Sequence, residues 1–196
     1  MADNSQADWT GALARARAHA PFLALGLDRQ PQLEAMLAVG RGEDALTQAR
    51  MIGSASAVGT ALRCQRWALA TTLAIGDLAG AFPLERVMHE LSDFADRALG
   101  AAIVEAIRRR VPDAEPAGFA ALALGKQGAR ELNYSSDIDP ILLYDPAKLP
   151  HRKRDEPVAA AARLHRGADR AHPATARRPR DGHWRHEKRA WHRPLR

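Results

Sequence analysis

The amino-acid sequence predicts an α+β protein with three regions: a helical N-terminal region at 1–110, a partial α/β unit at 111–158 and a disordered basic tail at 159–196. The first region is rich in Ala and Leu, and its apolar residues recur at helical spacing. The second contains two short apolar runs separated by a glycine turn, which is typical of two strands. The third has no Val, Ile, Phe or Met, so it has too little aliphatic surface to offset the entropy lost on folding.

Proline and glycine divide the first region into helices. Asp8 precedes the first helix and Pro21 follows it, while Gly40 ends the second. The predicted helices cover residues 9–20, 32–39, 43–52, 57–75 and 84–110, with a short apolar segment at 22–27. In the longest helix a stripe of apolar residues recurs at roughly three-to-four spacing: Val87, Leu91, Phe94, Leu99, Ile103 and Ile107. The region is predicted to be a helical bundle, and by itself it indicates no chemistry.

The pattern changes in the second region. Residues 118–124 (GFAALAL) form an uninterrupted apolar run of the length expected of a buried strand. Residues 125–136 follow with a glycine turn and about two turns of helix. Residues 137–145 (DIDPILLYD) form a second strand, and Pro140 places that strand at a sheet edge or near its own start. This order predicts an α/β unit with polar groups at its junctions.

The net charge separates the tail from the rest of the chain. The 29 Lys or Arg and 23 Asp or Glu residues give the whole chain a formal charge of +6. Residues 151–196 contain 14 Lys or Arg and 5 Asp or Glu, a net charge of +9, so residues 1–150 carry −3. The uniformly basic surface of a typical nucleic-acid-binding domain is therefore excluded.

The compartment is also indicated by the sequence. No stretch approaches the ~18 consecutive apolar residues of a membrane span, and the N-terminus has no basic and apolar secretory signal. The single cysteine, Cys64, cannot form an internal disulfide, and its place in a predicted helix favours a structural thiol over a nucleophile. The sequence therefore predicts a cytoplasmic protein with no membrane partner.

Two carboxylates in the second predicted strand are candidates for catalysis and metal binding. Asp137 and Asp139 are two residues apart, so in a strand both side chains lie on one face while Ile138 points to the core. Neighbouring carboxylates repel each other unless a cation lies between them. Mg²⁺ prefers such oxygen ligands and is commonly shared with substrate phosphates.

Polar residues upstream of these carboxylates extend the pattern. Gly125 allows close approach of the backbone to a phosphate, and Lys126 adds positive charge. Ser135 and Ser136 place hydroxyls beside the carboxylates. An acidic strand start capped by serine, common on protein surfaces, is the alternative. Gly-Lys followed twelve residues later by Asp-x-Asp and an apolar strand favours phosphate and metal chemistry.

The segment LGKQGARELNYSSDIDPILLYD, residues 124–145, closely resembles the nucleotidyltransferase signature of the glutamine synthetase adenylyltransferase / adenylyl-removing enzyme family. The flanking segments agree with this. Residues 73–80 and 82–110 are similar to the helical part that precedes the signature, and residues 14–23 are similar to the opening of proteobacterial members. The resemblance covers about residues 9–160.

The resemblance implies a fold, an activity and partners. The family has two polymerase-β-like nucleotidyltransferase domains in one long chain. One transfers AMP from ATP to a tyrosine of glutamine synthetase, and the N-terminal one removes that AMP by phosphorolysis, which releases ADP. By position this chain resembles an N-terminal fragment with the adenylyl-removing half. Its implied partners are glutamine synthetase and a PII-type signalling protein. The implied site residues are Asp137 and Asp139 for Mg²⁺ and catalysis, and Gly125, Lys126, Ser135 and Ser136 for the phosphates of ATP or ADP.

One departure from the family concerns a third carboxylate. The family supplies it in a later segment resembling Val-Asp-Leu-Arg-Leu-Arg-Pro, which has no counterpart here. Asp145 shares the strand parity of Asp139, but six residues of strand place it roughly 20 Å away. The metal site is therefore expected to be incomplete and the chain inactive by itself. A nucleotidyltransferase with another acceptor is the alternative enzyme.

The tail at 159–196 has several interpretations. His183 and His186 have a spacing compatible with metal binding, but no second pair of ligands supports it. A basic segment containing Trp184 and Trp191 is compatible with nucleic-acid binding through residues 151–196, the alternative from another functional class. The favoured interpretation is a non-functional tail produced by a frameshift in a GC-rich gene, with nucleic acid not a partner.

Overall fold

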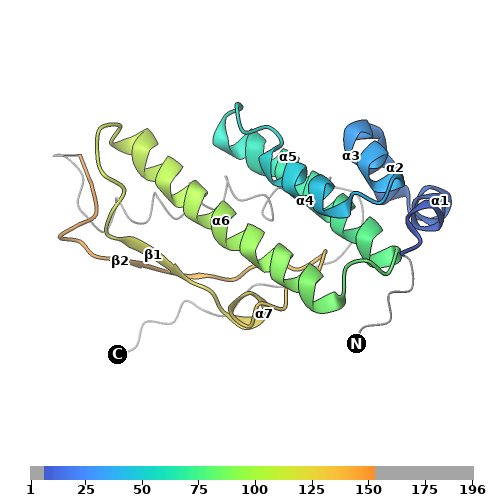
Figure 1. Ribbon diagram of the computed structural model, residues 1–196. Coiled ribbons are helices and arrows are strands. Elements are labelled where there is room, and N and C mark those ends of the chain that lie inside the picture. The colour runs from blue at the N-terminus through green and yellow to red at the C-terminus, as the bar shows by residue number, and fades with distance from the viewer. Residues whose placement is uncertain (1–6, 153–196) are drawn as a thin grey trace, which may run out of the picture.

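The computed structural model describes residues 7–152, and the predictions for the tail at 159–196 lie outside these residues. Helices make up most of the described chain, and a small sheet lies alongside the longest helix (Figure 1). The α+β prediction is confirmed. The helices of the first region are α1 Trp9–His19, α2 Pro21–Arg29, α3 Pro31–Ala38, α4 Gly42–Met51, α5 Val58–Leu78 and α6 Leu84–Arg110. Between residues 7 and 152, no helix is both long and apolar enough to cross a membrane.

Local sequence explains where the first helices begin. The Asp8 side chain accepts a hydrogen bond from the Gly11 amide at 2.8 Å and so caps α1. Pro21 and Pro31 each occupy the first position of a helix, where a missing N–H leaves no hydrogen bond unmade. The short apolar segment at 22–27, to which no helix was assigned, lies within the helix α2, because Pro21 follows one helix and starts the next.

A first hydrophobic core joins the N-terminal helices to α5. It is centred on side chains that are completely or almost completely buried: Ala12, Ala16, Leu27, Leu33, Leu37, Ala45, Ala49, Ala68 and Ile75. Trp9 packs against this core and also against the next one. The edge of the Trp9 ring meets Phe82 at a centroid distance of 5.9 Å. These contacts tie the start of the chain to the turn between α5 and α6.

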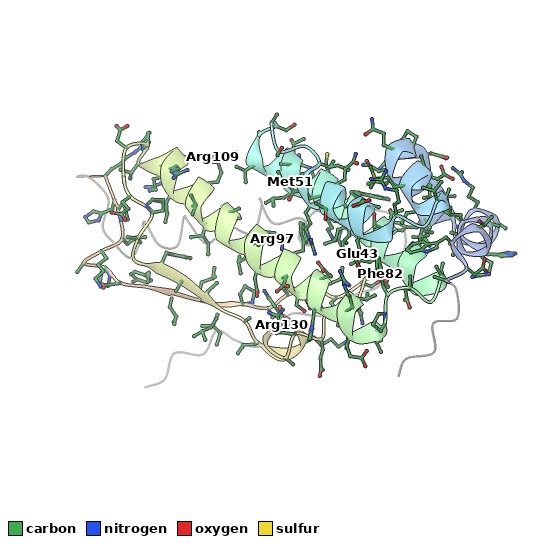
Figure 2. All side chains as sticks on the ribbon, in the orientation of Figure 1. Glu43, Met51, Phe82, Arg97, Arg109 and Arg130 are labelled. Carbon is green, nitrogen blue, oxygen red and sulfur yellow. The ribbon has the colours of Figure 1, made fainter. Side chains whose placement is uncertain are left out.

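A second core lies between α4, α5 and α6 (Figure 2). Its buried members are Leu46, Leu62, Leu69, Leu73, Phe82, Val87, Phe94 and Ala98. The stripe predicted on α6 is largely confirmed: Val87, Phe94, Leu99 and Ile107 are buried, while Leu91 and Ile103 are partly buried. The second core therefore fixes the first half of α6, and the rest of that helix continues beside the sheet.

The sheet consists of β1 Phe119–Leu122 and β2 Ile141–Tyr144, paired antiparallel with Phe119 opposite Tyr144. Gly118 precedes β1 with φ +70°, and a Cβ at that position would lie 2.4 Å from the backbone nitrogen of Leu149. Glycine therefore fits there both sterically and conformationally. Leu149 itself packs on Ile107 of α6 in a third, small cluster. This cluster holds the end of the described chain against the helix.

The register gives the two faces of the sheet different surroundings. Phe119, Ala121 and Leu142 are partly buried and share the face toward α6. Leu122, Ile141 and Leu143 share the opposite face with Ala120, and each of these three large side chains is about half exposed, at 47–50%. We call this second face, formed by Ala120, Leu122, Ile141 and Leu143, the outer sheet face.

Two predictions for the α/β unit were wrong in extent. The predicted strand at 137–145 is shorter, because Pro140 has no N–H for the strand ladder and β2 begins directly after it. The predicted two turns of helix at 125–136 are a single turn, α7 Gly125–Gly128. Arg130 has φ +60°, a conformation that cannot continue a helix.

Candidate active site

Asp137 and Asp139 lie in an extended segment just before β2 rather than within the strand. Their side chains are exposed, whereas those of Ile138 and Pro140 are partly buried, so exposure alternates along the segment. This alternation leaves both carboxylates exposed, as predicted for one face, although no strand hydrogen bonds hold them there. Ile138 lines a small cavity against α5 and α6, which anchors the segment from behind.

The turn before the carboxylates is stabilised by its own side chains. The Asn133 Oδ1 atom accepts hydrogen bonds from the Ser135 amide at 3.1 Å and from the Ser136 hydroxyl at 2.9 Å. The Ser136 oxygen in turn accepts a hydrogen bond from the Asn133 amide at 3.0 Å. Sequence reasoning missed Asn133, although an Asn two residues before a serine is a known signal for such a turn.

Gly125 and Lys126 lie in α7, which follows β1 after two residues. Gly125 has φ +55°, which favours glycine on conformational grounds alone, since no atom would crowd a Cβ there. At Gly128 the reason is steric: a Cβ would lie 2.7 Å from the carbonyl oxygen of Ala123. Lys126 is exposed at this turn.

The structure brings all of the predicted site residues around one cavity of about 560 Å³. Its lining consists of Leu124, Gly125, Lys126, Gln127, Asn133, Ser135, Ser136, Asp137 and Asp139. Within residues 7–152, the side chains of Lys126, Asp137 and Asp139 make no hydrogen bond or ion pair. One cation and two carboxylates therefore face the cavity without protein partners in that range.

The donor set fits a hard divalent cation in part. Two carboxylates are suitable oxygen ligands for Mg²⁺, which also retains waters and binds substrate phosphates. In the described part of the chain, no group of three His, Cys, Asp or Glu side chains is arranged to hold a metal ion. Asp137 and Asp139 would thus supply two ligands, and the remaining ligands would come from water, substrate or another segment.

Comparison with known proteins identifies the family. A profile described as glutamate-ammonia ligase adenylyltransferase matches residues 11–182. The chain belongs to this family. Glutamate-ammonia ligase is another name for glutamine synthetase, so the resemblance of residues 124–145 is confirmed at the level of the family. The match extends to residue 182, beyond residue 159, where the sequence predicts the tail to begin.

Members of this adenylyltransferase family with curated names are similar to much of the chain. A bifunctional glutamine synthetase adenylyltransferase/adenylyl-removing enzyme from Caulobacter vibrioides is 38% identical over 174 residues, which cover 79% of this chain and 17% of the relative. The enzyme of the same name from Xanthobacter autotrophicus is 45% identical over 109 residues, covering 50% and 11%. This chain therefore spans less than a fifth of the length of these relatives. No solved structure gives a significant match.

Two further residues of this member of the adenylyltransferase family lie in or behind the turn at 133–136. Arg66 on α5 lines a cavity of about 40 Å³ on the other side of the Asn133–Ser136 turn, and partial burial lowers the pKa of its guanidinium. Tyr134 packs against the second core, and burial raises the pKa of its hydroxyl, with the Asp77 carboxylate adding to the effect. Sequence reasoning assigned no role to either residue, because their surroundings depend on contacts between the turn and the helices α5 and α6.

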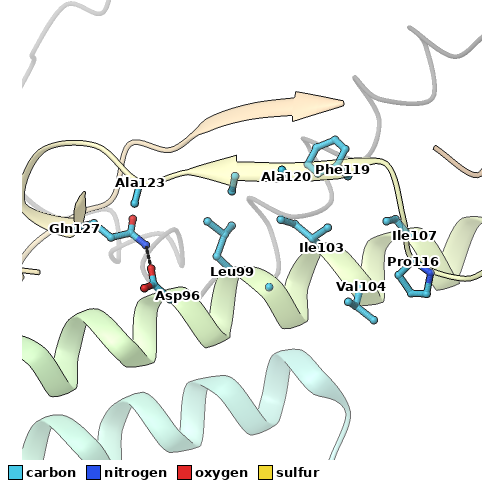
Figure 3. Close-up of a pocket in the computed structure, with 12 residues that line it drawn as sticks. Asp96, Leu99, Ile103, Val104, Ile107, Pro116, Phe119, Ala120, Ala123 and Gln127 are labelled. Carbon is cyan, nitrogen blue, oxygen red and sulfur yellow. Dashed lines mark hydrogen bonds between the residues drawn. The ribbon is translucent and has the colours of Figure 1, made fainter. Parts of the chain in front are cut away.

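Gln127 is a further residue to which sequence reasoning assigned no role. It is buried and donates a hydrogen bond from Nε2 to Asp96 Oδ1 of α6 at 2.8 Å (Figure 3). It lines both the candidate site and a second cavity of about 470 Å³ between α6 and β1. The turn that carries Lys126 is therefore connected directly to the longest helix.

Proposed function

We propose that this chain contributes the nucleotide- and metal-binding part of an adenylyl-removing site that acts on glutamine synthetase. The observation that carries the proposal is the single cavity that the predicted residues line together. Family membership and the name of the Caulobacter vibrioides relative support the reaction class and the target protein. In this proposal phosphate is the substrate and ADP the product of the removing reaction, ATP is the AMP donor of the family's opposite reaction, and a PII-type protein is the proposed regulator. The single, unpaired Cys64 is compatible with the reducing cytoplasm.

The reaction needs positioning and charge stabilisation more than covalent help from the protein. An oxygen of inorganic phosphate attacks the phosphorus of AMP on a tyrosine. The bond between phosphorus and the tyrosine oxygen breaks, ADP forms, and the tyrosine oxygen takes up the proton that phosphate releases. A bound Mg²⁺ would stabilise negative charge on the phosphoryl oxygens.

Each residue of the site has a proposed role in this reaction. Asp137 and Asp139 hold the cation through oxygen atoms that have no competing partner in residues 7–152. Lys126 lies close to the phosphates and attracts them, while Gly125 allows the backbone to approach them. Ser135 and Ser136 line the cavity on a turn that their hydrogen bonds to Asn133 stabilise. The site is thus partly formed before a ligand binds.

We further propose that the chain is inactive by itself. Nucleotidyltransferase sites of this kind use a third carboxylate, and the described residues place only Asp137 and Asp139 at the cavity. The isolated chain, incubated with adenylylated glutamine synthetase, phosphate and Mg²⁺, is expected to release no ADP above background. Robust ADP release that is lost in Asp137→Ala would contradict this.

A chimera tests the function separately from the missing carboxylate. Residues 9–145 of this chain would replace the matching segment of the Caulobacter vibrioides relative, and ADP release from adenylylated glutamine synthetase would be measured. We expect Asp137→Asn or Asp139→Asn to lower the rate about 100-fold or more, because each removes a charge from the cation site. Asp145→Asn is the control, since Asp145 lies beyond β2 and does not line the cavity.

The same chimera distinguishes the alternatives. If the variants of Asp137 and Asp139 release ADP as fast as the unchanged chimera, the assignment of the site is wrong. If these variants lose AMP transfer from ATP to glutamine synthetase but retain ADP release, the segment supports the opposite half of the family's chemistry. If neither reaction occurs but AMP is transferred to another hydroxyl compound, the acceptor is not glutamine synthetase.

A further inference from the structure

The chain from 127 to 132 lies along one turn of α6 and runs antiparallel to it. At the beginning of this segment, Gln127 Nε2 donates to Asp96 Oδ1 at 2.8 Å. Three residues later, a guanidinium nitrogen of Arg130 donates to Asp93 Oδ1 at 2.6 Å. Asp93 and Asp96 are three residues apart on the helix, so their side chains lie on the same face. Two side chains of the segment, three residues apart, are thus bound to two side chains of α6 that are also three residues apart.

A third contact completes this arrangement one residue earlier on the helix. The Leu132 amide donates to the Ser92 hydroxyl oxygen at 3.4 Å, a long contact in a buried environment. The Ser92 hydroxyl itself donates to the Met88 carbonyl at 2.8 Å, which orients the oxygen toward Leu132. Leu132 and Ser92 are both buried, so water does not compete for this contact. The segment is therefore held at both ends and in the middle.

Gln127 connects this arrangement to the candidate site, because it binds Asp96 of α6 and also lines the cavity. It is only 4% exposed, whereas Gly125 and Lys126 before it are exposed. Its Oε1 atom is buried and accepts no hydrogen bond within the described residues, so the bond to Asp96 is the polar contact that fixes the side chain. Since α7 is a single turn, fixing Gln127 against α6 also fixes the direction in which Lys126 leaves the turn.

The cavity behind the turn makes this bond more important. Leu99, Ile103 and Phe119 line the space between α6 and β1, and Asp96 and Gln127 close one end of it (Figure 3). Apolar packing does not fill this space, so it cannot by itself hold α7 at a fixed distance from the helix. The hydrogen bond between Gln127 and Asp96 supplies a directional constraint at that end.

We propose that Asp96 and Gln127 are positioning residues that hold the Gly125–Lys126 turn in the geometry needed to bind nucleotide phosphates. The identity of the ligand in this proposal rests on the proposed function, whereas the restraint of the turn by Asp96 and Gln127 does not. Asp96 acts through Gln127, and neither residue contacts the reacting atoms. The helical region is then part of the site rather than a separate unit that precedes it.

The experiment uses the full 196-residue chain and two measurements. Hydrogen exchange of residues 125–132 is measured without ligand, and Mg-ATP binding is measured by calorimetry. Asp96→Ala removes the acceptor of Gln127, while Asp96→Asn retains an acceptor oxygen. Glu105→Ala is the matched control, because Glu105 pairs with Arg109 on the same helix, away from the turn. Asp96 is exposed, so its variants are expected to fold.

We expect Asp96→Ala to speed exchange in the turn by about tenfold and to weaken Mg-ATP binding by a similar factor, since the hydrogen bond from Gln127 loses its acceptor. Asp96→Asn should restore both quantities, and Glu105→Ala should change neither. Unchanged exchange and affinity in Asp96→Ala, or equal effects in Glu105→Ala, would overturn the proposal. If the unchanged chain binds no Mg-ATP, the proposed function is in doubt, and the exchange measurement still decides whether Asp96 holds the turn.

Discussion

Tyr134 is the residue whose chemistry depends most on its place between the helices and the site. Its hydroxyl is buried and has no hydrogen bond of good geometry to any residue between 7 and 152, and burial raises its pKa above the ordinary value. The carboxylate of Asp77 at the end of α5 raises the pKa further. The neutral phenol is therefore favoured in the folded protein, and ionisation in alkaline solution must act against folding.

This predicts a pH effect on stability. A group whose pKa is raised by folding contributes its stability fully below the unfolded pKa of about 10, and that contribution is lost as pH rises toward the folded pKa. Urea midpoints of the unchanged chain should therefore fall more steeply above about pH 10 than those of Tyr134→Phe. Tyr144→Phe is the control, as it changes the other of the two tyrosines. Parallel midpoint curves for all three chains would show that Tyr134 is not responsible.

Gly76 and Gly100 both lie within helices, but only Gly76 is required by the packing around it. Gly76 in α5 faces Phe82, and a Cβ there would lie 2.1 Å from a ring carbon of that buried side chain. Gly100 in α6 has no atom within 4 Å of a Cβ position. The missing side chain at Gly76 lets Phe82 pack in the second core, whereas Gly100 only lowers the stability of α6.

Alanine substitutions should therefore act in opposite directions. Gly76→Ala should destabilise the protein by about 1–3 kcal/mol, because the Phe82 ring must move within a packed core. Gly100→Ala should stabilise it by about 0.5–1 kcal/mol through helix propensity. Chemical denaturation followed by circular dichroism measures both. Similar changes in the two variants would mean that contact with Phe82 does not decide the outcome at Gly76.

Sequence reasoning was most successful for elements that carry many repeated signals. α6 begins and ends at the predicted residues, because its apolar stripe is long and Pro83 marks its start. It was least successful for short elements: the helix α2 was missed, and α7 is shorter than predicted. A helix of one turn is decided by a few backbone dihedrals, such as that of Arg130, which composition does not encode.

The candidate site follows the same rule. Gly125, Lys126 and the two aspartates could be found from spacing, because phosphate and metal chemistry require those residue types. Gln127 could not be recognised, because its role depends on a contact with α6 more than thirty residues earlier in the chain. Long-range contacts of this kind become visible only when the helix and the turn are placed together.

At the scale of the whole molecule, the outer sheet face gathers three large, half-exposed apolar side chains on one surface. Leu122, Ile141 and Leu143 are about half exposed on a two-stranded sheet, and within residues 7–152 it is the inner face that packs on α6. An isolated pair of strands is marginal in water, and an exposed apolar face favours association. The sheet should therefore be the least stable part of the described fold and the first to promote aggregation.

A double variant tests this. Leu122→Thr with Leu143→Thr keeps residues that favour strands but removes apolar surface, so light scattering on heating should fall while the free energy of unfolding changes by less than about 1 kcal/mol. Leu142→Thr is the control on the inner face and should lower the free energy of unfolding by about 1–2 kcal/mol. Equal scattering in the double variant and the unchanged chain would exclude the outer face as the cause of association.

The division of α6 between two sets of contacts has a consequence for synthesis. Every buried member of the two helical cores precedes residue 99, whereas β1 begins at Phe119 and β2 at Ile141. Domains made from the N-terminus can fold as they leave the ribosome. The helices can therefore assemble while the strands are still being made. The second half of α6 is then already folded, and β1, β2 and the glycine turn pack against it last.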